Sequence, residues 1–155
     1  MSPFPPDTVP FAAGVWIAAR LLPVCVGSSE LDRLLSMATP RPGRSAHTHL
    51  SPAAIAAAVK RAARRPWVMR NRRCLREGLL AFHYLRLAGH HPLLHFAVEP
   101  GSLSEAKLAA HCWVTVDDDV LMNPPTPTMM NLFAWDGMRM IKPVGAIGPA
   151  VHVHE

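Results

Sequence analysis

The sequence predicts an α+β fold in which helices come first and antiparallel strands follow. Segments with helical periodicity and helix-capping residues occupy the chain up to Gly89, whereas apolar alternation and turn residues begin at residue 92. The 16 prolines confine each helix to the stretch between two of them, which argues against a helical bundle throughout. With 155 residues, 50% of them hydrophobic, the chain has the size of one domain with one core.

The first part of the chain is expected to be partly irregular. Residues 1–10 include four prolines and predict an irregular or extended arm. A helix is expected to begin at Ser28 or Ser29, whose side chains can cap the next amides, and to stop before Pro40. Residues 39–50 have the proline, glycine and serine content of a loop.

Two stronger helix signals follow this loop. Residues 52–65 predict a helix, because Ser51 can cap it, a proline occupies its first turn, cations fill its last turn and Pro66 closes it. A central helix is expected from residue 73 or 74 to residue 88, with Gly89 as its stop. Apolar residues surround most of the circumference of this second helix, so we expect it to run through the core.

The strands are predicted from alternation and turn residues. Residues 93–98 alternate as a strand with both faces partly covered. Residues 108–116 and 120–123 are expected to pair as a hairpin around a turn at Asp117 and Asp118.

Cysteine content and hydropathy bound the cellular setting. Cys25, Cys74 and Cys112 are an odd number without CxxC spacing, which fits neither a disulfide framework nor a zinc knuckle. Reduced thiols in a cytoplasm are the simplest interpretation. The apolar residues 11–22 include Arg20 and are too few to span a bilayer, so we expect no membrane insertion.

Basic residues concentrate between residues 60 and 76. Nucleic acid is not the expected partner for this run, because the aromatic content is low and no recognition motif accompanies it. A solvated basic face and a peptide-binding surface remain as alternatives. The run contains Lys60, Arg61, Arg64, Arg65, Arg70, Arg72, Arg73 and Arg76.

Three residues form a candidate catalytic group. Cys74 opens the predicted central helix among arginines, where the helix dipole and nearby cations favour a thiolate; its alternative role is that of a small buried hydrophobe. His111 lies within a predicted strand, an unusual place for a polar ring unless it faces a site. The return strand ends in Asn123, so thiol, imidazole and an orienting side chain can stand in a row.

The residues also resemble a known family. Cys74-Leu75 opening a helix, Leu85 with Gly89 before a strand, and AHCWV at residues 110–114 are similar to the family pattern CL…LRRxG…AHAWVE. The family is the leader peptidase of lasso-peptide biosynthesis, a transglutaminase-like cysteine protease that forms the stand-alone protease half of the maturation B protein. The resemblance covers roughly residues 50–125.

The resemblance implies roles for individual residues. Cys74 corresponds to the nucleophile and His111 to the general base. The third member, acidic in the family, matches Asn123, with Asp119 as the alternative at the start of the same strand. The family's alanine after the histidine is Cys112 here, and alternation places Cys112 on the opposite strand face from His111, so Cys25 and Cys112 are expected to be structural.

The expected architecture is a transglutaminase-like or papain-like α+β fold with a central helix packed on an antiparallel sheet. We expect one domain, in which residues 1–50 are helical or irregular, residues 51–125 form the catalytic core, and residues 126–155 hold a hairpin within residues 134–141 and a tail.

The resemblance implies hydrolysis of the bond between the leader and the core of a ribosomally made precursor, through a thioester and without a metal or cofactor. It also implies two protein partners, a leader-recognition protein and an ATP-dependent lasso cyclase, one of which the basic run would dock. A non-catalytic peptide- or nucleic-acid-binding module on the same fold is the alternative from another class, and acyl transfer by the same residues is the alternative reaction.

Overall fold

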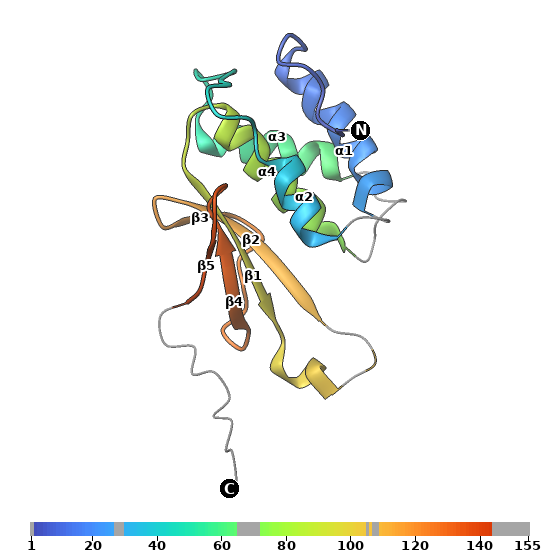
Figure 1. Cartoon of the computed structure of the whole chain (residues 1–155), viewed down its shortest axis with the longest axis vertical. Helices are drawn as coiled ribbons and strands as arrows, with labels where there is room; N and C mark the ends of the chain where they lie inside the picture. Colours follow the sequence, from blue (N-terminus) through green and yellow to red (C-terminus); the bar gives the residue numbers. More distant parts are fainter. Residues whose placement is uncertain (1, 27–29, 65–71, 105, 107–108, 144–155) are drawn as a thin grey trace, which may run out of the picture.

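Helices gather in one half of the molecule and strands in the other (Figure 1). The computed structural model describes residues 2–26, 30–64, 72–104, 106 and 109–143. The separation of helices from strands, with the helices first in the chain, confirms the predicted α+β order. The helices are α1 (Phe11–Val26), α2 (Leu31–Ala38), α3 (Pro52–Ala63) and α4 (Arg73–Leu87), and the strands are β1 (Pro92–Val98), β2 (Ala110–Val116), β3 (Asp119–Met122), β4 (Met130–Trp135) and β5 (Met140–Ile141), with a 3₁₀ helix at Pro100–Ser104.

The two strong helix predictions are confirmed. The Ser51 hydroxyl accepts a hydrogen bond from the amide of Ala54 at 3.2 Å, and a proline occupies the first turn of α3. Helix α4 begins at Arg73 and is followed by Gly89, whose φ of 88° is the left-handed conformation that glycine adopts without strain. Pro66 lies outside the described residues.

The N-terminal half differs from prediction in two places. Helix α1 continues to Val26 with Pro23 inside it, although this proline cannot donate a backbone hydrogen bond to the preceding turn. Helix α2 has Glu30 at its N-cap without a side-chain cap, so the predicted serine cap is wrong; Ser28 and Ser29 lie outside the described residues. The loop at 39–50 and the irregular arm at 2–10 are confirmed.

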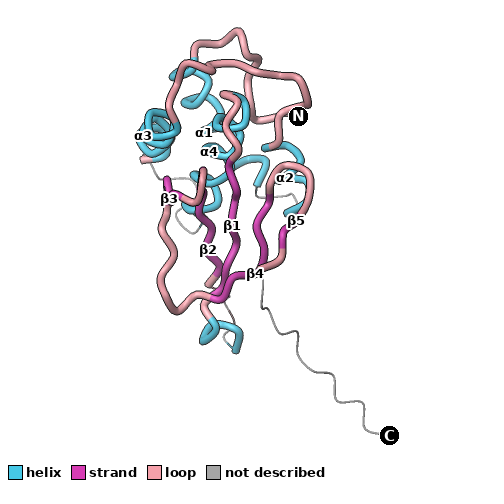
Figure 2. Tube along the Cα trace, turned by 90° about the vertical axis from the view of Figure 1, so that its left-hand side faces the viewer, coloured by secondary structure: helices cyan, strands magenta, loops and turns pink. Residues whose placement is uncertain are grey.

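The strands form one antiparallel sheet in the order β3-β2-β1-β4-β5, which Figure 2 shows side by side. Strand β2 begins at Ala110, two residues later than predicted, and residue 108 is not among those described. The turn between β2 and β3 is confirmed at Asp117 and Asp118, which both have positive φ. Strands β4 and β5 confirm the C-terminal hairpin, although β4 begins four residues earlier than expected.

Helix α4 runs through the core, as predicted. Phe82 and the leucines of α4 other than Leu75 are buried against α1, α2, α3 and the helix-facing side of the sheet, and Leu75 is partly buried. A glycine lets α4 approach β1 and β2 closely: a Cβ at Gly78 would lie 2.9 Å from Cδ1 of Leu94 and 3.3 Å from Sγ of Cys112. This contact places the start of α4 over the beginning of β2. In the described part of the chain, no helix is long and apolar enough to cross a membrane.

Candidate active site

The candidate nucleophile stands at the beginning of α4. Cys74 is the second residue of this helix and is half-buried. The N-cap residue Arg72 provides no side-chain cap, so the first amides of the helix stay directed at the space around Cys74. Such amides stabilise negative charge, and a thiol at this position is therefore biased toward its thiolate.

The surroundings of Cys74 favour the thiolate strongly. A hydrogen bond from the Cys112 side chain lowers its pKa most, and the Cys112 amide and the charge and hydrogen bond of His111 lower it further. Burial acts in the opposite direction. The net effect lowers the pKa of Cys74 from 9.0 to about 5. At neutral pH this side chain is therefore a thiolate in contact with an imidazole, which is the ionised pair that cysteine hydrolases use.

The imidazole of His111 is held from its far side. Its Nε2 donates a hydrogen bond of 2.9 Å to the main-chain oxygen of Asn123. A ring that donates from Nε2 leaves Nδ1 as the atom that takes the proton from the Cys74 thiol and returns it during the reaction. Trp113 lies two residues along β2 and stacks at 20° to the ring of His111, with 6.2 Å between centroids. The tautomer and the orientation of the base are thus both fixed.

Asn123 is brought to His111, but through a different group from the one predicted. The sequence suggested an orienting side chain, whereas the contact is made by the main-chain carbonyl. Asn123 follows the last residue of β3 with φ of 53°, a left-handed conformation that asparagine tolerates, and this bend turns its carbonyl toward the imidazole. Its side-chain Nδ2 is buried and has no hydrogen-bond partner among the described residues.

Asp119, the alternative third residue, lies at the wrong end of the hairpin. It pairs with Val116, five residues along β2 from His111, which is about 16 Å at the rise of a strand. Asp119 is also exposed to solvent. It therefore cannot orient His111, and this alternative is wrong.

Cys112 belongs to the site, contrary to its predicted structural role. Alternation along β2 does place Cys112 and His111 on opposite faces of the strand. Helix α4 covers the face that carries Cys112, and Cys74 lies at the edge of this face, where the side chains of both Cys112 and His111 reach it. Cys112 is 2% exposed, and its contact with Cys74 together with burial raises its pKa. The sequence signal was its position next to the candidate base. Cys25 lies on α1, apart from this group.

A hollow of about 400 Å³ opens beside the nucleophile. Basic residues from α3 and α4 dominate its walls. The basic run in the sequence predicted a basic surface, but not a hollow beside Cys74. Lys60 and Arg64 are four residues apart at the end of α3 and so share one helix face. Arg65 and Arg70 lie outside the described residues. The lining consists of Lys60, Arg64, Arg73, Cys74, Glu77 and Asn123.

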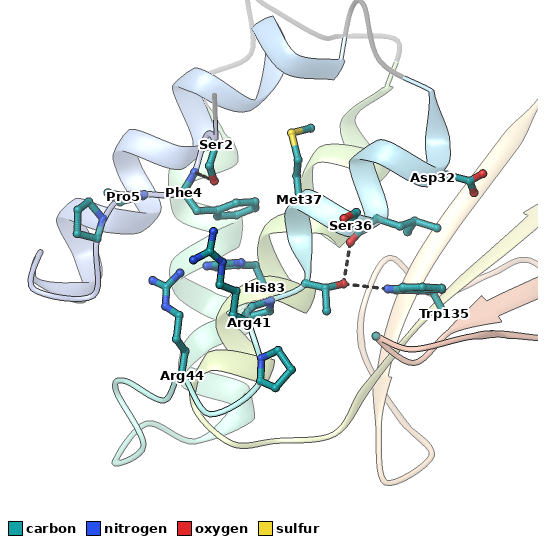
Figure 3. Close-up of a pocket in the computed structure, with 16 residues that line it drawn as sticks. Ser2, Phe4, Pro5, Asp32, Ser36, Met37, Arg41, Arg44, His83 and Trp135 are labelled. Atoms are coloured by element: carbon teal, nitrogen blue, oxygen red, sulfur yellow. Dashed lines mark hydrogen bonds between the residues drawn. The ribbon is translucent and has the colours of Figure 1, made fainter.

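A larger cavity, about 930 Å³, lies elsewhere (Figure 3). Its walls come from the N-terminal arm, α2 with the loop after it, α4 and the end of β4, and include Phe4, His83 and Trp135. Trp135 Nε1 donates to Thr39 Oγ1 at 3.1 Å across it. None of the three candidate catalytic residues lines this cavity, so its size does not make it the active site. Within the described residues, no group of three or more His, Cys, Asp or Glu side chains is arranged to hold a metal ion.

The site thus consists of a helix-opening cysteine, a strand histidine and a carbonyl that orients the histidine, on a helix packed against an antiparallel sheet. The family comparison agrees: the profile of the Transglutaminase-like superfamily matches residues 15–131. This match spans most of the chain, and the protein belongs to the transglutaminase-like superfamily. Comparison with curated proteins and with solved structures returned no match.

Proposed function

We propose that this protein is a cysteine peptidase that removes the leader from a ribosomally made lasso-peptide precursor. Cys74 is its nucleophile, His111 its general base and acid, and Asn123 the residue that orients His111. The observation that carries the proposal is the contact of a depressed-pKa thiol with an imidazole held on its far side. The AHCWV segment and the membership of the superfamily support it.

The geometry suits a two-step hydrolysis. The Cys74 thiolate attacks the carbonyl carbon between leader and core, and His111 protonates the leaving amine of the core as the peptide bond breaks. A thioester then joins Cys74 to the leader. Water attacks this thioester while His111 accepts its proton, which releases the leader carboxylate and restores the thiolate. The chain itself supplies each group that these steps require, and the proposal involves no metal or cofactor.

Two partners complete the proposed pathway. A leader-recognition protein delivers the precursor, and an ATP-dependent cyclase closes the macrolactam on the released core. The basic surface at the end of α3 and the start of α4 is the proposed docking region for one of them. The proposed setting is the cytoplasm, where the free thiols of Cys25, Cys74 and Cys112 stay reduced.

The test is cleavage of a lasso precursor, with its recognition protein present, in water enriched in ¹⁸O. We expect two products, the intact core and a leader whose new carboxylate contains one ¹⁸O atom. His111→Ala should lose this activity while its thermal unfolding stays close to that of the wild type. Transfer of the leader to an added amine, without ¹⁸O incorporation, would show acyl transfer in place of hydrolysis. The proposal also fails if the wild-type protein leaves the precursor intact.

A further inference from the structure

The hollow beside Cys74 carries an excess of positive charge. Its lining holds three cations, Lys60, Arg64 and Arg73, and two anions, Glu77 and the Cys74 thiolate. Glu77 is already paired, because Arg73 Nε lies 2.8 Å from its Oε1 and the Glu77 side chain is only 4% exposed. Lys60 and Arg64 are exposed and form no salt bridge with any residue that the structure describes. Two cations therefore face this space without a carboxylate of their own.

The placement of these cations relates them to the substrate. They line the same 400 Å³ hollow as the nucleophile, so a group bound between them lies next to the bond under attack. An arginine guanidinium holds a carboxylate through two parallel hydrogen bonds, and a lysine adds a point charge. A neutral or cationic group would leave both charges uncompensated.

We propose that this hollow is a carboxylate-binding subsite in which Lys60 and Arg64 hold an acidic side chain of the peptide substrate beside Cys74. This inference rests on the proposed function insofar as Cys74 is the nucleophile. Because the peptide chain continues on both sides of a bond cut between leader and core, the carboxylate comes from an aspartate or glutamate near that bond and not from a chain end. Lys60 and Arg64 are thus residues that determine substrate specificity.

Alkylation of Cys74 tests the subsite without a substrate. Iodoacetate and iodoacetamide react with the same thiolate and differ in one negative charge. The measured quantity is the rate constant for iodoacetate divided by that for iodoacetamide, and this ratio does not depend on the ionised fraction of the thiol. We expect this ratio to be higher for Cys74 than for N-acetylcysteine amide, a neutral reference thiol. Mass spectrometry of the peptide containing Cys74 separates its alkylation from that of the other cysteines.

Variants at the end of α3 then assign the effect. Lys60→Gln and Arg64→Gln should each lower the ratio about three-fold, and the double variant about ten-fold, as expected for unit charges close to a partly solvated anion. Arg61→Gln is the matched control, since Arg61 is exposed on the same helix and carries the same charge but does not line the hollow. We expect Arg61→Gln to leave the ratio unchanged. Circular dichroism and thermal unfolding of each variant show whether the fold is retained.

Two results would overturn the inference. One is a double variant with the wild-type ratio. The other is an equal fall in Arg61→Gln, which would mean that the general positive field of the protein, and not the hollow, attracts the anion. Either result leaves the peptidase proposal standing if His111→Ala still abolishes cleavage. Conversely, if the wild type and the variants show the predicted alkylation ratios but no precursor is cleaved, the peptidase proposal is refuted and the subsite is retained.

Discussion

Replacing Cys112 by alanine should make Cys74 a weaker acid. The Cys112 side chain is the largest influence that lowers the pKa of Cys74 to about 5, and alanine removes this side chain but keeps the amide that also contributes. A hydrogen bond to a charged group is worth about 1.5–3 kcal/mol, and one pKa unit corresponds to about 1.4 kcal/mol. Because a thiol is a weak donor, we take the lower end and expect the pKa of Cys74 to rise by about one unit.

The rate of alkylation by iodoacetamide, measured from about pH 4 to about pH 9, reports this pKa directly. In the wild type the rate should rise around pH 5 and stay flat through neutral pH, because about 99% of Cys74 is then ionised. The Cys112→Ala midpoint should lie about one pH unit higher, and Cys25→Ser, which changes a thiol on α1, should match the wild type. A wild-type midpoint near pH 9, or an unshifted midpoint in Cys112→Ala, would refute the assigned contact.

Three further predictions concern the site and its support. Asn123→Gly should retain most cleavage activity and Asn123→Ala less, because the orienting group is a main-chain oxygen and glycine adopts the φ of 53° with less strain than alanine. Equal, complete losses of activity in both variants would restore the side chain as the group that orients His111. Gly78→Ala should lower the free energy of unfolding by about 1–3 kcal/mol in denaturant titration, since its Cβ would lie 2.9 Å from Leu94; an unchanged midpoint would contradict the close approach of α4 to the sheet. Burial lowers the pKa of His83 from 6.5 to about 4, so the unfolded chain binds this proton first and stability should fall as the pH drops from 6.5 to 4; His83→Gln should flatten that dependence in thermal unfolding, and an identical slope would exclude His83 as its source.

Local signals in the sequence were sufficient for most of the fold. The serine cap and first-turn proline of α3, the glycine that ends α4, and the paired aspartates between β2 and β3 each act within a few residues of their own position. The early start of β4 was missed, because Met130 and Leu132 are more than 40% exposed and residues 130–133 lack the buried alternation that marks a strand. Its pairing with β1 determines this strand, and that contact is non-local.

The candidate site was predicted at the level of residues and missed at the level of atoms. Cys74, His111 and Asn123 do converge, as the order of helix and strands suggested. Which group of Asn123 faces the imidazole depends on one backbone dihedral angle, which the sequence does not encode locally. Cys112 was excluded because alternation separates it from His111, yet only the packing of α4 decides which face of β2 lies under the nucleophile.

The hollow beside Cys74 could not be predicted from the sequence either, because it also depends on tertiary packing. Lys60 and Arg64 are spaced i, i+4 and so share one helix face, but this spacing alone does not show that the face borders the start of α4. The pairing of Glu77 with Arg73 within α4 was also readable as an i, i+4 pair. What the charges do together follows from tertiary packing between α3 and α4.

The central claim is that Cys74 is the nucleophile of a leader peptidase. Its most direct test compares wild type and Cys74→Ala on one lasso precursor with the recognition protein present, by mass spectrometry of the products over time. We predict that Cys74→Ala retains the wild-type fold by circular dichroism and releases no leader, because the residue contributes the attacking sulfur and little packing. Release of the leader by Cys74→Ala at a rate near that of the wild type would contradict the account.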